Sequence, residues 1–171
     1  MVRRLLDALY RLSGYLAAFF LFAIAATIIG QIIGRFVGIA IDSTELSGFC
    51  LAATTFLGLA YTLKGGSHVR VNLLIRHFTG VSKKAVELWC CGLAALAVGY
   101  LAYNAILFAY ESFVFGDKSP GLIAAPFWIP QSGMALGLFI LTVALADEFV
   151  LITRNRTPGY ETDIETALGD D

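Results

Sequence analysis

Long apolar blocks separated by short polar segments run along the whole chain. A transmembrane helix needs about 20 predominantly apolar residues. Four blocks approach or exceed this length, and they cover about residues 12–34, 46–63, 85–110 and 129–152. The pattern predicts an all-α integral membrane protein with four transmembrane helices in one domain, residues 1–152. A polar, acidic tail follows at residues 153–171.

The composition agrees with a membrane protein. Of the 171 residues, 58% are hydrophobic and only 15% are charged, whereas a soluble domain carries about 25% charged residues. The net charge of −1 provides no general attraction to nucleic acid. The three cysteines, Cys50, Cys90 and Cys91, lie in apolar blocks without a metal-binding or redox spacing, which indicates buried thiols.

Lysine and arginine gather on one side of the predicted membrane domain. Four spans place the N-terminus, the second connection and the C-terminus on the same side. That side holds ten of the twelve basic residues, and the other side holds only Arg35 and Lys118. Because basic segments remain in the cytoplasm, this asymmetry predicts that both termini are cytoplasmic.

The second connection contains an unusual polar stretch, LKGGSHVRVNLLIRHFTG, at Leu63–Gly80. Gly65 and Gly66 allow the chain to leave the second span sharply. The apolar residues that follow predict a short interfacial helix, whose basic neighbours contact lipid headgroups. These neighbours are Arg70, Arg76, Lys83 and Lys84. The two histidines, His68 and His77, supply too few ligands for a metal, so we expect a structural role for this stretch.

The ionisable residues stand at the span ends, whereas autonomous transporters and membrane enzymes usually carry some inside the membrane. The mid-span polar residues Gln31 and Asn104 are expected to hydrogen-bond across helices. A haem anchor would need histidines at membrane depth, and here both lie in the polar connection. The pattern therefore favours a membrane subunit without catalytic residues, metal or cofactor. The alternatives are a membrane-anchor subunit of a redox enzyme complex and a self-sufficient, homodimeric small transporter.

Glycines four residues apart occur in the first and fourth spans, and such ridges let helices approach closely. They are Gly30 and Gly34, and Gly133 and Gly137. These glycines serve either packing within the four-helix unit or contact with a partner chain.

The two connections on the side opposite the termini carry a few charges. We expect these to be either ordinary solvated charges or docking residues for a partner protein. They are Arg35, Asp42, Glu45, Asp117 and Lys118. Glu45 also suits the N-terminal dipole of the second helix.

Several of these motifs occur together in one known family. Glu45 precedes the second span, FLG follows within it at Phe56–Gly58, and KGGSHVRVNLL comes next at Lys64–Leu74. A proline-aromatic-proline pattern at Pro126–Pro130 opens the fourth span. With four spans over residues 10–152, the chain resembles the small membrane subunit, the Q component, of tripartite ATP-independent periplasmic (TRAP) transporters. The positions that match the family's connection motif are Lys64, Gly65, Gly66, His68, Val69 and Asn72, with Asn72 where an aspartate is common.

The resemblance implies a three-protein, sodium-coupled uptake system of the bacterial cytoplasmic membrane. A periplasmic binding protein captures a small organic acid or zwitterion, and a large multi-span M subunit binds the substrate and the sodium. The Q subunit is then a scaffold that braces M and helps dock the binding protein. The resemblance thus implies contacts with the M subunit, the binding protein and phospholipids, and no cofactor on this chain.

Overall fold

The computed structural model describes residues 2–39, 43–64, 81–121 and 124–154. Four helices account for most of them: α1 (Val2–Phe36), α2 (Thr44–Lys64), α4 (Val81–Phe115) and α5 (Trp128–Thr153). Each is long and apolar enough to cross a membrane. The predicted all-α architecture with four spans is thereby confirmed. The expected interfacial helix between the second and third spans, and residues 155–171 of the tail, lie outside the described residues.

Helices α1 and α4 extend beyond the apolar blocks, because the flanking residues include no glycine or proline until the helices end. The segment expected as a loop from Glu111 is helical as far as Phe115. Both helices end at a glycine with positive φ, Gly38 at 80° and Gly116 at 67°. In each case the next amide reaches back five residues, from Ile39 to the Gly34 carbonyl and from Asp117 to the Ser112 carbonyl. This is a Schellman ending, which glycine favours.

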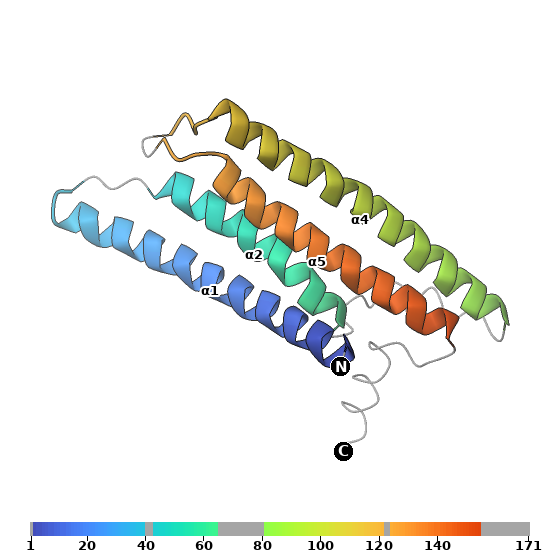
Figure 1. Ribbon diagram of the computed structural model, residues 1–171. Helices are drawn as coiled ribbons and strands as arrows, with labels where there is room; N and C mark the ends of the chain where they lie inside the picture. Colours follow the sequence, from blue (N-terminus) through green and yellow to red (C-terminus); the bar gives the residue numbers. More distant parts are fainter. Residues whose placement is uncertain (1, 40–42, 65–80, 122–123, 155–171) are drawn as a thin grey trace, which may run out of the picture.

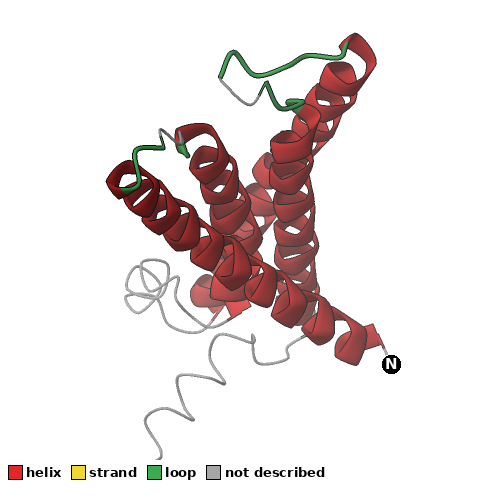
Figure 2. Ribbon diagram, turned by 90° about the vertical axis from the view of Figure 1, so that its left-hand side faces the viewer, coloured by secondary structure: helices red, strands yellow, loops and turns green. Residues whose placement is uncertain are grey.

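The helices lie side by side in the order α1, α2, α5, α4, as Figure 1 shows. The α1–α2 hairpin and the α4–α5 hairpin meet along α2 and α5, whereas α1 and α4 share no comparable contact. Both short connections lie at one end, here called the loop end (Figure 2). The opposite end, here called the basic end, holds the first residues of α1 and α4 and the last residues of α2 and α5.

Small residues fill the contact between α2 and α5. Ala60 and Ala144 are completely buried. A Cβ added at Gly137 would lie 2.5 Å from the Phe56 carbonyl oxygen and 2.7 Å from its Cβ, so the two backbones touch. A Cβ added at Gly133 would lie 3.6 Å from the Ala53 Cβ, an ordinary contact. Of the two roles considered for these glycines, the fold therefore favours packing within the chain.

The outward faces of α1 and α4 are covered with large apolar side chains. Phe22 on α1 and Leu96 on α4 are 72% and 74% exposed. Apolar surfaces of this extent are not stable in water. They suit a chain whose flanking helices face lipid or another membrane protein.

Candidate functional site

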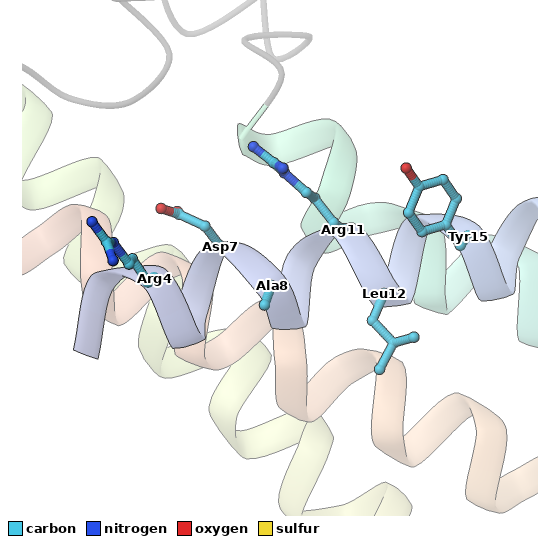
Figure 3. A pocket seen from close by; sticks show the side chains of 6 residues that line it. All are labelled: Arg4, Asp7, Ala8, Arg11, Leu12 and Tyr15. Atoms are coloured by element: carbon cyan, nitrogen blue, oxygen red, sulfur yellow. The ribbon is translucent and has the colours of Figure 1, made fainter. Parts of the chain in front are cut away.

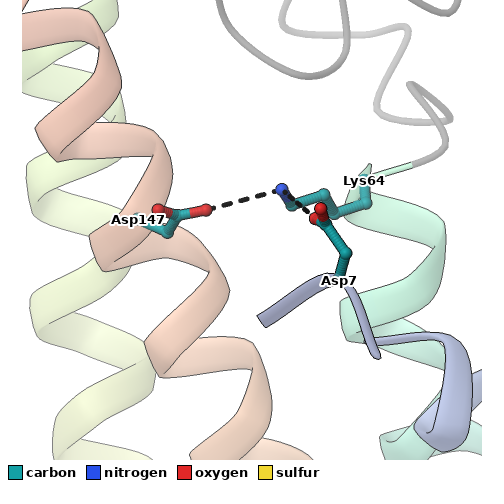
Figure 4. A network of polar contacts seen from close by, with 3 residues as sticks. All are labelled: Asp7, Lys64 and Asp147. Atoms are coloured by element: carbon teal, nitrogen blue, oxygen red, sulfur yellow. Dashed lines mark hydrogen bonds and ion pairs between the residues drawn. The ribbon is translucent and has the colours of Figure 1, made fainter. Parts of the chain in front are cut away.

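An ionic cluster joins three helices at the basic end. Lys64 is the last residue of α2, and its Nζ lies 3.4 Å from Asp7 Oδ1 on α1 and 3.4 Å from Asp147 Oδ2 on α5 (Figure 4). The side chains of Lys64 and Asp147 are only 18% and 19% exposed, and that of Asp7 is 46% exposed. A cation at the last turn of a helix also complements the helix dipole. The cluster therefore links the α1–α2 hairpin to the α4–α5 hairpin.

Tyr10 of α1 lies beside this cluster. The Lys64 ammonium is 5.0 Å from the centre of the Tyr10 ring, which is within cation–π range. Tyr10 is only 2% exposed, and its hydroxyl has no hydrogen-bond partner among the described residues. Glu148, the neighbour of Asp147, is 3% exposed. A partly buried lysine that contacts two aspartates is held in position, which suits a fixed link between helices.

Sequence reasoning did not find this cluster, although it marked Lys64 as part of the family motif. The sequence does show opposite charges at the ends of different spans, which is the signal for such a cluster. It does not show which spans are neighbours, so the ion pairs could be identified only once the order of the helices was known. Among the described residues, no group of three or more His, Cys, Asp or Glu side chains could hold a metal ion.

The loop end holds several of the residues expected to dock a partner. Arg35, Asp117 and Lys118 are exposed, and Glu45 is half-buried in the first turn of α2. The Glu45 carboxylate lies directly against Gly121, so the α4–α5 connection covers the start of α2. Asp42 lies outside the described residues.

Backbone hydrogen bonds stiffen the connection between α4 and α5. The Phe127 amide donates to the Asp117 carbonyl at 3.0 Å, and the Ser119 amide donates to the Ala125 carbonyl at 2.9 Å. Lys118 forms an antiparallel bridge with Pro126. The charged side chains of this connection are therefore presented on a braced backbone.

The mid-span polar residues behave differently from each other. Gln31 near the end of α1 accepts a hydrogen bond of 2.5 Å from the Ser43 hydroxyl, just before α2 begins. Asn104 forms no hydrogen bond to another of the described helices. Its Nδ2 donates to the Tyr100 carbonyl one turn earlier in α4, and its side chain is exposed.

Most residues of the predicted polar connection lie outside the described residues. Besides Lys64, two of its basic residues fall in a described segment, namely Lys83 and Lys84 in the first turn of α4, and Lys84 is half-buried. The predicted residues outside the described segments here are Gly65, Gly66, His68, Val69, Arg70, Asn72 and Arg76. Of the α1 glycines, Gly34 is buried, and a Cβ added at Gly30 would meet no atom within 4 Å.

An open hollow of about 440 Å³ lies on α1 at the basic end (Figure 3). The residues that line it all belong to this one helix: Arg4, Asp7, Ala8, Arg11, Leu12 and Tyr15. A small-molecule site normally buries most of its ligand in a concave cleft. The surface of a single helix does not do this, so the hollow does not indicate a substrate site.

Comparison with known proteins agrees with the fold and with the sequence motifs. Residues 24–155 match the family described as tripartite ATP-independent periplasmic transporters, DctQ component. No curated protein and no solved structure matches the chain. The matched region covers most of the chain and runs from within α1 to the end of α5. The chain therefore belongs to the DctQ family, the small membrane components of the tripartite ATP-independent periplasmic transporters.

Proposed function

We propose that this small TRAP transporter subunit is a fixed scaffold in the bacterial cytoplasmic membrane. It braces the large M subunit and helps dock the periplasmic binding protein during sodium-coupled uptake of a small organic acid or zwitterion. Substrate and sodium bind to the other two proteins. Family membership supports the assignment to this transporter class, and the arrangement of the helices supports the scaffold role.

The row of four helices is the observation that carries this proposal. A polar solute needs a path walled by protein on all sides, because lipid does not satisfy polar groups. Here α1 and α4 lie at the two edges of the row and do not close on each other. The described helices thus form a wall rather than a channel. A wall whose two hairpins are linked by the Lys64 cluster at one end, and packed together where Glu45 meets Gly121 at the other, suits a brace.

The charge asymmetry supports an orientation with the basic end in the cytoplasm. The loop end then faces the periplasm, where the binding protein arrives. Exposed Asp117 and Lys118 on the braced connection are available there for charge-complementary docking.

Transport in reconstituted vesicles tests the proposed scaffold role. The chain, its co-expressed M subunit and the binding protein are reconstituted together and in each incomplete combination, with a sodium or a proton gradient. Uptake is expected only with all three proteins and inward sodium. Robust uptake by this chain alone would contradict the scaffold role, and proton-driven uptake would contradict sodium coupling.

Charge reversal tests the docking role. Lys118→Glu combined with Asp117→Lys should lower uptake at limiting binding protein and leave uptake at saturating binding protein nearly unchanged. Arg154→Glu, an exposed reversal at the basic end, is the matched control and should have no such effect. Equal loss with both variants would count against docking at the loop end.

A further inference from the structure

The outward face of α4 carries polar groups where a lipid-facing helix would be apolar. Its exposed residues at helical spacing include Tyr100, Tyr103, Asn104, Tyr110 and Glu111. Residues on the other side of the same helix are buried against α5. The polar stripe therefore points away from this chain.

The middle of this stripe lies at membrane depth. Ala102 and Ala105, which flank Asn104, pack in one cluster with Leu138 of α5, and Phe56 of α2 packs against that cluster. Phe56 stands near the centre of α2, which has 21 residues. At about 1.5 Å per residue, α2 is roughly 31 Å long and matches a bilayer core of about 30 Å. Asn104 thus lies at membrane depth, within the predicted span of about residues 85–110.

Asn104 uses only part of its hydrogen-bonding capacity within this chain. Nδ2 donates to the Tyr100 carbonyl at 2.7 Å, which is the one hydrogen bond of this side chain among the described residues. The carbonyl oxygen and the second N–H of the amide have no hydrogen bond among the described residues, and the side chains of Asn104 and the adjacent Tyr103 are both exposed. Hydrocarbon offers no partner for these atoms, whereas a neighbouring transmembrane helix does.

The corresponding surface of α1 has the opposite character. Every exposed residue of α1 between positions 18 and 33 is alanine, leucine, isoleucine or phenylalanine. Phe22 and Ile29, exposed by 72% and 55%, are typical of it. The only polar side chains in that stretch, Thr27 and Gln31, bond to the Ile24 carbonyl and to Ser43. The exposed part of this face is entirely apolar and is suited to lipid.

We propose that the α4 stripe, Tyr100 to Glu111, is the surface that binds the large M subunit, and that the outward face of α1 faces lipid. The inference rests on the proposed function, because it takes the M subunit as the occupant. The facing helix of M is expected to offer hydrogen-bonding groups to Asn104 and Tyr103, and a cation to Glu111. Gly30 and Gly34 make α1 the alternative contact, and the surface at Gly30 is open, but the exposed residues around it are apolar.

Site-specific photocrosslinking in the intact complex tests the assignment. A benzophenone amino acid replaces Tyr103 or Leu107 on α4, or Phe22 or Ile29 on α1 as matched controls, with M co-expressed. After irradiation, crosslinks to M are expected from both α4 positions and none above background from the α1 positions. Crosslinks to M from α1 alone, or crosslinks from α4 to a second copy of this chain, would overturn the assignment.

Copurification distinguishes failure of the surface assignment from failure of the proposed scaffold function. If M copurifies with this chain but crosslinks only to α1, the surface assignment fails and the scaffold function stands. If M does not copurify at all, both fail. As a second measurement, Asn104→Leu should lower the melting temperature of the complex with M but not that of the chain alone. An unchanged complex would overturn the role of Asn104, and Ile29→Leu on α1 serves as the control.

Discussion

The close contact between α5 and α2 at Gly137 predicts that even a methyl group at this position destabilises the fold. A Cβ at this position would lie 2.5 Å from the Phe56 carbonyl oxygen and 2.7 Å from the Phe56 Cβ. Real Cβ atoms essentially never approach other atoms below 3.0 Å. Because part of the obstacle is backbone, a change of rotamer cannot relieve the clash. Gly137→Ala must therefore push the two helices apart at the centre of their contact.

The neighbouring glycine provides a matched control for the magnitude. Gly133→Ala places its Cβ 3.6 Å from the Ala53 Cβ, where it fits. Both substitutions gain about the same helix propensity, roughly 0.5–1 kcal/mol. Only Gly137→Ala adds overpacking, which typically costs about 1–3 kcal/mol. The difference between the two variants should therefore be about 1–3 kcal/mol, with Gly137→Ala the less stable.

Equilibrium unfolding in mixed micelles measures this difference. Each purified variant is titrated with dodecyl sulfate, and loss of packing is followed by the fluorescence of Trp89 and Trp128. Gly133→Ala should unfold at the wild-type concentration or above it, and Gly137→Ala below it. If the two variants unfold together, the α2–α5 contact is not as close as described and the reasoning fails.

Three further predictions concern polar contacts and use the same unfolding measurement. Lys64→Met should destabilise the chain by about 1–2 kcal/mol, a value between those typical of exposed and of buried ion pairs. Asp7→Asn should destabilise it by only about 0.2–1 kcal/mol, because Asp7 is more exposed. Equal losses of stability in the two variants would contradict this order. A double-mutant cycle of Gln31→Leu and Ser43→Ala should give a coupling energy of about 1 kcal/mol, and strict additivity would refute the bond. Tyr10→Phe should not lower stability, since the hydroxyl is buried without a partner among the described residues, and a loss above about 1 kcal/mol would reveal one.

Several properties of this protein follow from its sequence alone. The lengths of the apolar blocks predict four transmembrane helices, because the bilayer thickness sets the length of a span. The connection motif and the proline pattern before the fourth span identified the family. The helix ends were predicted less well, since α1 and α4 continue through polar flanks that contain no breaker until Gly38 and Gly116.

Only the tertiary structure decided which faces of these helices meet. In a soluble helix, an apolar stripe marks the side that packs against the core. In a membrane, lipid and protein accept apolar side chains almost equally, so the sequence pattern loses this directional signal. For that reason the order α1, α2, α5, α4, the partners of Lys64 and the packing of Gly137 had to come from the fold. The same holds for Asn104, which the sequence marked as polar at membrane depth and which the fold turns outward, away from the other helices of its own chain.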